Sequence, residues 1–372
     1  MKHESFGFYH DHIASSRIKA LSKMEHLYLV ILAGGEGLRL FPYSNLERPK
    51  QLCHIDGGDR NKDTFLKRTI TNFVDCGFDR NHIMVVTSSE RQLSATRHQA
   101  ANPGGVPIKN VWRIPAICGP AGTMVEATRR IAELDPEAIV VNTPSDHYLV
   151  PNHQFIGAVL DAVNYAEQGF VCEVGSVSHN TGIIAWRAAD FLVSAPTDTE
   201  NLNLNQLQDV FKDNYKLTVG DFEWKDCDTF QKLYQALDKS SRQNVLLGEG
   251  EYKLDNSCHH SLFYVDKGLT LSACDVANCA VIFTMIEKQP VLLVANLSED
   301  QTIKELAEEF SLQGRLVNSE ATLSVQDNQV LYSNLKDNSS VGFVSVSNFV
   351  TCIHRRCDYG TIEAEVFKRQ KS

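Results

Sequence analysis

The sequence has no long hydrophobic run, although 43% of its 372 residues are apolar. A helix that crosses a bilayer needs about 20 consecutive apolar residues, and no segment approaches that length. The first 25 residues also lack the apolar stretch of a signal peptide, so we expect them to form an N-terminal extension. These absences predict a cytoplasmic protein with no membrane partner.

Basic charge is scarce as well. Lys and Arg number 36 against 46 Asp and Glu, which gives a net charge of -10. A general nucleic-acid binder normally carries a basic face, so we expect no nucleic-acid partner. The ten cysteines include no C-x-x-C pair, and several stand in apolar runs. This usage is typical of reduced core thiols in a cytoplasmic protein.

Buried strands alternate with helical segments along the first two thirds of the chain. Strands are expected at 27–32, 82–87 and 138–141, and helices at 64–76 and 123–134. The alternation predicts an α/β fold, in which a Rossmann-like, mostly parallel sheet carries helices on both faces.

From about residue 244 onward, the sequence consists of short segments with the alternating pattern of β-strands. This pattern predicts a smaller β-rich C-terminal domain. The chain is therefore expected to have three parts. They are the N-terminal extension (1–25), the α/β domain (26–243) and the β-rich domain (244–372).

The segment LYLVILAGGEGLRLFPYSNLERPKQ combines a buried strand, a glycine loop and two cations. Gly34, Gly35 and Gly37 allow the backbone to approach a ligand and to point its N–H groups at negatively charged oxygens. Arg39 and Lys50 add positive charge. The spacing is neither the dinucleotide fingerprint nor a Walker loop. The glycines alone also fit a tight turn, but with the cations they predict a nucleotide phosphate site.

A carboxylate is expected at the same edge of the sheet. Asp146 follows the strand at 138–141, and ligands of parallel sheets bind outside the carboxyl ends of the strands. A carboxylate that faces phosphates needs a cation between them, and Mg²⁺ is the usual one. An isolated aspartate at this place also fits a turn or a helix cap. Together with the glycine loop, Asp146 favours a metal site.

The string LAGGxGxRLxPxS…PKQ resembles the signature of sugar-phosphate nucleotidyltransferases, and its PKQ ending is similar to that of mannose-1-phosphate guanylyltransferases. The resemblance implies GTP and a sugar 1-phosphate as substrates and Mg²⁺ as cofactor. It implies catalytic roles for Arg39 and Lys50. The residues implied to bind the nucleotide are Leu32, Ala33, Gly34, Gly35, Gly37 and Gln51.

Shorter strings extend the resemblance to about residue 310. PSDH resembles the family's metal-binding motif, which holds Asp146 here. FEWKDCDTF resembles its F-D-W-S-D box, in which Asp226 would be a second metal ligand. Asn180 and Gly182 fall on the family's N-S-G strand, which approaches the sugar. The C-terminal region of relatives commonly packs between subunits, which implies a homo-oligomer formed through the C-terminal domain.

The chain departs from the family pattern mainly where the sugar would bind. Leu38 stands where relatives usually have threonine, the R-N-T-A-P-A box has no clean counterpart, and Asp228 replaces a glycine. The interval between Asp146 and Asn180 lacks the family's Y-G-Y-I turn and its E-K-P strand end. Glu173 is the candidate to replace the glutamate of E-K-P. The enzyme hypothesis therefore has a rival, a catalytically impaired, nucleotide-binding regulatory homologue.

Overall fold

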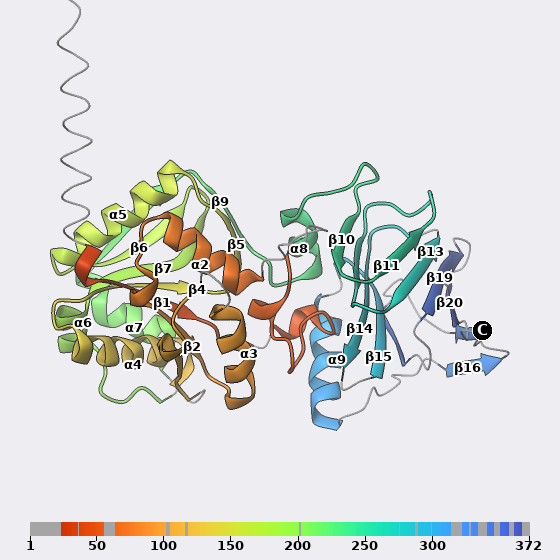
Figure 1. Ribbon diagram of the computed structural model, residues 1–372, viewed down its shortest axis with the longest axis horizontal. Helices are drawn as coiled ribbons and strands as arrows, with labels where there is room; N and C mark the ends of the chain where they lie inside the picture. The colour runs from red at the N-terminus through yellow and green to blue at the C-terminus, as the bar shows by residue number, and fades with distance from the viewer. Residues whose placement is uncertain are drawn as a thin grey trace, which may run out of the picture. The chain divides into compact units, whose positions relative to one another are not determined.

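A computed structural model gives the three-dimensional structure of the chain (Figure 1). The residues that it describes are 24–366 without 36, 56–63, 102–104, 116–117, 201, 275, 287–288, 299, 314–321, 327–328, 334–340, 346–349 and 357–360. Within them, no helix is both long enough and apolar enough to cross a membrane. The chain divides into two compact units. The first comprises Met1–Gly34 and Leu66–Trp224, and the second comprises Gly35–Phe65 and Lys225–Ser372.

A seven-stranded, mostly parallel sheet lies at the centre of the first unit. Its order is β3-β2-β1-β4-β7-β6-β8. The bounds are β1 Leu27–Leu32, β2 Ile83–Thr87, β3 Val111–Arg113, β4 Ile139–Pro144, β6 Val171–Ser176, β7 His179–Arg187 and β8 Tyr215–Gly220. Only β7 runs antiparallel to its neighbours, β4 and β6, among the described strands of this sheet. The predicted fold class is confirmed.

Strand β1 is buried on both faces. Leu29, Val30 and Ile31 are all inaccessible to solvent, so side chains of both parities face protein. This explains the unbroken apolar run, because a strand covered on both sides has no polar face. The register pairs Leu32 with Pro144, so β1 and β4 end together at one edge of the sheet.

Helices cover both faces of this sheet (Figure 1). They are α2 Phe65–Asp75, α3 Glu90–Ala100, α4 Gly119–Leu134, α5 His153–Glu167, α6 Ala188–Ser194 and α7 Leu204–Phe211. On one face, Trp186 of β7 stacks on Phe191 of α6, which stacks on Phe211 of α7, with centroid distances of 4.5 and 4.9 Å. On the other face, Phe73 of α2 contacts Phe155 of α5 edge to face at 5.8 Å.

Helix α4 begins at Gly119, earlier than the predicted start at Thr123. Pro120 lies in its first turn. The first N–H groups of a helix have no acceptor within the helix, so proline costs nothing there. The Gly-Pro pair therefore opens this helix, whereas elsewhere it would interrupt one. Short 3-10 helices in this unit are η1 Met24–His26, η4 Arg80–His82, η5 Ile108–Asn110 and η7 Lys212–Asn214.

Two β-sheets form most of the second unit. One has the order β10-β12-β14-β15-β18 and the other β11-β13-β19-β20-β17-β16. Their bounds are β10 Val245–Gly248, β11 Glu251–Leu254, β12 Leu262–Val265, β13 Thr270–Cys274, β14 Cys279–Ile286, β15 Gln289–Asn296, β16 Thr322–Gln326, β17 Gln329–Ser333, β18 Val341–Ser345, β19 Val350–Arg356 and β20 Thr361–Val366. The chain alternates between the sheets from β10 to β14, and it buries Phe263, Leu271 and Phe283 in one apolar cluster. The strand-rich C-terminal region is confirmed.

The second unit also contains the middle of the signature segment. Helices η2 (Leu38–Leu40) and η3 (Lys50–Leu52) belong to it, together with α8 (Phe230–Ala236) and α9 (Asp300–Gln313). The chain therefore passes from the first unit to the second within the glycine loop, between Gly34 and Gly35. The division into domains at 26–243 and 244–372 stays a prediction.

Candidate active site

The end of β1 carries the first part of the glycine loop. Ala33 N donates to Val86 O at 2.7 Å, which continues the pairing with β2 beyond Leu32. Ser88 Oγ donates to Gly34 O at 3.2 Å. Leu32 is half-buried and Ala33 is fully buried. The glycine loop thus begins at the carboxyl edge of the sheet, where hydrogen bonds fix the N–H group of Ala33 and the carbonyl group of Gly34.

Gly37 packs directly against Lys50 in the second unit. Its φ of 69° lies in the left-handed region, and a Cβ atom there would lie 2.6 Å from Lys50 Cβ. Ser44 Oγ donates to Gly37 O at 2.5 Å. Lys50 begins η3 with a side chain that is only 4% exposed, and Gln51 beside it is buried. The glycine at 37 therefore lets the loop and the buried cation touch.

Replacing Gly37 by alanine is expected to lower the free energy of unfolding by about 1–2 kcal/mol, the usual cost of a left-handed L-residue, with a further loss from the collision with Lys50. Denaturant unfolding measures the change. Gly35→Ala is the matched control, because a Cβ atom at Gly35 would have no described atom within 4 Å. Equal losses in the two variants would contradict the packing of Gly37 on Lys50.

Both predicted cations are paired with aspartates of the FEWKDCDTF segment. Lys50 Nζ lies 3.2 Å from Asp226 Oδ1, and Arg39 Nη1 lies 2.9 Å from Asp228 Oδ2. A buried ammonium group needs such a partner, because an isolated charge out of water is very costly. Asp228 was not predicted as a site residue. The signal for it was its replacement of a glycine in the altered F-D-W-S-D box.

Asp146 lies in the bend between β4 and β5 (His147–Val150) of the first unit and is half-buried. Ser145 N donates to Leu32 O at 3.1 Å, which ties this bend to the end of β1. Gly182 of β7 has a φ of 70°, and a Cβ atom there would lie 3.3 Å from Pro144 Cγ. The structure therefore brings Asp146 and Gly182 to the edge of the sheet where β1 ends.

An aromatic cluster adjoins Asp146, and the sequence did not reveal it. Trp224 Nε1 contacts His147 Nδ1 at 3.2 Å, and the two rings meet edge to face at 4.9 Å. The ring of His179, on β7, lies 5.5 Å from the Trp224 ring. Asn180, the next residue of β7, is exposed. These three rings come from separate strands, β5, β7 and β9 (Glu223–Asp226), so no local pattern links them.

Glu173 lies inside the sheet of the first unit. It is buried in β6, and Tyr215 OH of β8 donates to its Oε2 at 2.5 Å. Burial and this hydrogen bond raise the pKa of Tyr215. Val177 and Ser178 alone join β6 to β7, so a tight hairpin stands where the family resemblance implies a longer segment. Glu173 therefore already has a protein partner.

Asp146 and Asp226 are the carboxylates predicted to hold a metal ion. Among the described residues, no three His, Cys, Asp or Glu side chains gather as metal ligands. Magnesium at a nucleotide commonly takes one or two carboxylates and fills its other positions with phosphate oxygens and water. Asp146 is half-buried, and the Asp226 side chain is 37% exposed, so neither carboxylate is fully shielded from solvent.

Known proteins resemble this chain over most of its length. Residues 29–299 match the family described as MobA-like NTP transferase domain. The mannose-1-phosphate guanylyltransferase of Escherichia coli K12 is 33% identical over 159 residues, which are 41% of this chain and 30% of that protein. The mannose-1-phosphate guanylyltransferase ManC of Salmonella typhimurium LT2 is 32% identical over 165 residues, which are 42% of this chain and 32% of that protein. The chain thus spans about a third of the length of these relatives.

A solved structure shares the fold. The protein named mannose-1-phosphate geranyltransferase from Thermus thermophilus superposes with a TM-score of 0.59, over 77% of this chain and 99% of that chain, at 16% identity. Such a likeness concerns the fold alone, and it agrees with the mostly parallel sheet of the first unit. The family match runs from β1 to beyond β15 and includes the glycine loop and all four paired charges. The chain therefore belongs to the family of MobA-like NTP transferase domains.

Proposed function

We propose that the protein transfers a nucleotidyl group from GTP to a sugar 1-phosphate, with mannose 1-phosphate as the first candidate, and releases pyrophosphate. One observation carries the proposal. The buried Lys50 lies against Gly37 of the glycine loop and is paired with Asp226. Membership of the nucleotidyltransferase family supports the reaction class. The names of the curated relatives support guanine and mannose.

In this reaction a sugar phosphate oxygen attacks the α-phosphorus of the nucleotide in line. A new P–O bond forms as the bond to the leaving pyrophosphate breaks. The protein supplies positioning and charge stabilisation and takes no covalent part. Backbone N–H groups of Gly34, Gly35 and Gly37 would hold the phosphates. Arg39 would neutralise the pyrophosphate, and Lys50 would stabilise charge at the reacting phosphate.

The two ion pairs suggest how the cations reach the phosphates. When Lys50 leaves Asp226 for a phosphate oxygen, another cation can take its place beside that half-exposed carboxylate. We propose Mg²⁺ as the cofactor, with Asp146 and Asp226 as its candidate ligands. When bound, magnesium neutralises phosphate charge and orients the oxygens. Arg39 is 45% exposed, so phosphate can compete for it with Asp228 more easily than for the buried Lys50.

The sugar side of the site rests on fewer groups. Asn180 is exposed at the start of β7, and Gly182 lies against Pro144. We propose that Asn180 and Gly182 contact the sugar phosphate. Glu173 is the third candidate, and it would have to exchange its bond to Tyr215 for the sugar. A substitution of Tyr215 that removes its hydroxyl would therefore test whether Glu173 becomes available to the sugar.

A coupled assay of pyrophosphate release tests the function. A panel of nucleoside triphosphates is crossed with a panel of sugar 1-phosphates, with and without Mg²⁺. We expect release only where GTP, mannose 1-phosphate and Mg²⁺ are present together. A faster reaction with another base or sugar would correct the substrates and keep the reaction class. No release in any combination would contradict the proposal.

A second candidate function is nucleotide binding without turnover, as in a regulatory homologue. The tight β6–β7 hairpin and the occupied carboxylate of Glu173 favour it. Thermal unfolding with GTP and Mg²⁺ separates the two, because a ligand at 100 times its dissociation constant stabilises a protein by about 2.7 kcal/mol. Stabilisation without any pyrophosphate release would favour the regulatory function. The homo-oligomer formed through the C-terminal region and the cytoplasmic location also remain proposals.

A further inference from the structure

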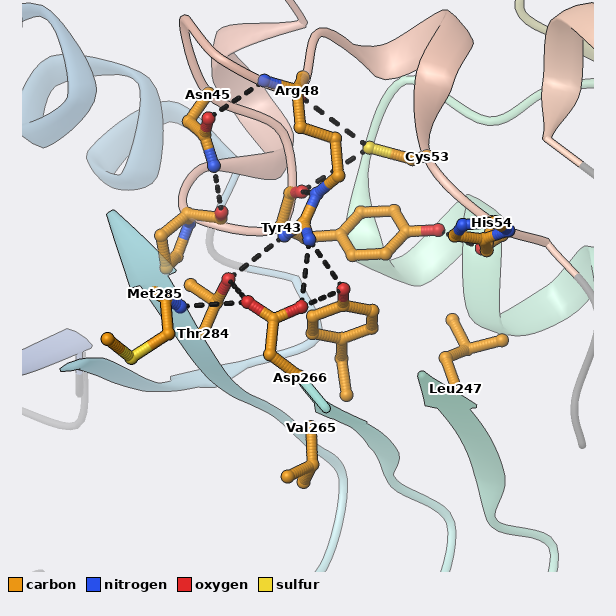
Figure 2. Close-up of polar contacts among 12 residues, drawn as sticks. Tyr43, Asn45, Arg48, Cys53, His54, Leu247, Val265, Asp266, Thr284 and Met285 are labelled. Carbon is orange, nitrogen blue, oxygen red and sulfur yellow. Dashed lines mark hydrogen bonds and ion pairs between the residues drawn. The ribbon is translucent and has the colours of Figure 1, made fainter. Parts of the chain in front are cut away.

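Arg48 connects the segment that carries Lys50 to the strands of the second unit (Figure 2). Its guanidinium lies 4.8 Å from the centroid of the Tyr264 ring. It donates from three nitrogens, and the acceptors are Tyr43 O at 2.9 Å, Tyr264 OH at 2.6 Å, Asp266 Oδ1 at 2.9 Å and Thr284 Oγ1 at 3.0 Å. The planar fork of arginine can satisfy acceptors in several directions at once. Arg48 thereby joins one loop to the ends of two strands.

Asp266 is the centre of this network on the strand side. Besides Arg48, it accepts hydrogen bonds from Tyr264 OH, Thr284 Oγ1 and Met285 N (Figure 2). Burial alone would raise the pKa of Asp266, but the charge of Arg48 and these hydrogen bonds outweigh it and lower the pKa. Thr284 is fully buried, and the side chains of Arg48 and Asp266 are 21% and 17% exposed, so most of the network is shielded from water. A charge pair with this many fixed partners has one well-defined geometry.

The loop side of the network is equally ordered. Asn45 Oδ1 accepts from Glu47 N at 3.0 Å and from Arg48 N at 2.9 Å, and Asn45 N donates to Arg48 O at 2.8 Å. Tyr43 is fully buried, and its hydroxyl donates to His54 O. Cys53 Sγ donates to Tyr43 O at 3.3 Å. Residues 43–54 therefore form a closed loop, and Lys50 lies within it.

The connection from Arg48 to Lys50 is short and stiff. Only Pro49 separates them, and its φ of -65° is the value that the proline ring imposes. The described groups that bond to the Arg48 side chain include none of the predicted site residues. The backbone of the loop therefore connects Arg48 to the reaction through Lys50.

We infer that Arg48 is a positioning residue, which holds Lys50 against Gly37 and Asp226 by docking the 43–54 loop on Tyr264, Asp266 and Thr284. The β-strands of the second unit thus support nucleotidyl transfer by holding the loop that carries Lys50. The effect on the reaction rate rests on the proposed function. The effect on the order of the loop does not.

The test compares Arg48→Lys and Asp266→Asn with a matched control. Lysine keeps a charge beside Asp266 but cannot reach Tyr43 O and Thr284 together. Arg129→Met is the control, because Arg129 of α4 also makes several bonds, to Glu126 at 2.5 Å, Pro196 O at 2.8 Å and Thr197 O at 3.3 Å. The readouts are kcat, KM for the nucleotide, and hydrogen–deuterium exchange of residues 43–54. The melting temperature of each variant is measured alongside.

In Arg48→Lys we expect kcat to fall up to about 10²-fold, as for a reacting group misplaced by about 1 Å, with a much smaller change in KM. Exchange of 43–54 should become faster in both network variants. Arg129→Met should lower the melting temperature but leave kcat and the exchange of 43–54 unchanged. Unchanged exchange in Arg48→Lys, or an equal loss of kcat in Arg129→Met, would overturn the inference.

The design separates this inference from the proposed function. If the unaltered protein transfers no nucleotide to any sugar phosphate, the proposed function fails, and the exchange comparison still decides whether Arg48 orders the loop. If Arg48→Lys does not fold, Asp266→Asn decides, because it keeps the fork of Arg48 and removes the negative charge that faces it. Normal kcat and normal exchange in Asp266→Asn would also overturn the inference.

Discussion

Replacing Lys50 by methionine is expected to lower kcat for pyrophosphate release about 10²–10³-fold, the usual effect of removing one group that stabilises transition-state charge. Methionine replaces the apolar part of the lysine side chain and lacks only the ammonium group, whose Nζ lies 5.7 Å from the centroid of the Phe65 ring. Asp226 loses this partner but stays 37% exposed, so water can solvate it and the fold should persist. The loss is therefore one of charge at the phosphates. Steady-state kinetics with both substrates saturating measures it.

Lys304→Met is the control for Lys50→Met. Lys304 pairs with Glu308 at 3.5 Å on α9, and such exposed pairs contribute little to stability. We expect its kcat to match that of the unaltered protein. The role of Lys50 would be contradicted if Lys50→Met retained full kcat with an unchanged melting temperature.

Replacing Asp146 by alanine is expected to abolish Mg²⁺-dependent pyrophosphate release. If Asp146 supplies one of only two protein carboxylates to the ion, its loss leaves the phosphates with too little positive charge. Asp146→Asn tests the charge separately, because asparagine keeps the shape of the side chain. We expect the Asp146→Asn variant to need far more Mg²⁺ than the unaltered protein to reach the same rate of pyrophosphate release. Mg²⁺ is titrated at a fixed GTP concentration, and both pyrophosphate release and GTP binding are measured. The titrations give the Mg²⁺ concentration that each variant needs for release and for GTP binding.

Asp135→Asn provides the matched control for Asp146. Asp135 ends helix α4 and binds His26 Nδ1 at 2.9 Å, which holds the pKa of His26 above its usual value. It is not a candidate metal ligand, so its variant should show the Mg²⁺ dependence of the unaltered protein. A normal Mg²⁺ titration in Asp146→Asn would show that this carboxylate does not serve the metal.

The α/β part of the fold was predictable because its strands and helices carry strong local patterns. The run at 27–32 has no polar face, and it forms a strand buried on both sides. The predicted helix at 64–76 corresponds to α2. The start of α4 was missed because the meaning of Gly119-Pro120 depends on its place in the first turn, which tertiary packing decides. Periodicity alone does not contain that information.

The partners of the cations were harder to predict. The sequence singled out Arg39 and Lys50, but their contacts to Asp228 and Asp226 join positions far apart in the chain. The same holds for Arg48 and Asp266. Such pairs leave no trace in spacing or hydropathy, because they depend on how the loop folds onto the strands. Trp224 with His147 is another example, formed by two short strands.

Exchange of labelled pyrophosphate into GTP tests the central claim, nucleotidyl transfer at this site, most directly. The unaltered protein is incubated with GDP-mannose, Mg²⁺ and labelled pyrophosphate, and the label in GTP is counted. Label is expected in GTP only when GDP-mannose and Mg²⁺ are both present, and almost none is expected with Lys50→Met. A protein that binds nucleotide but transfers no label from pyrophosphate to a nucleoside triphosphate, whichever nucleotide-sugar is supplied, would contradict nucleotidyl transfer.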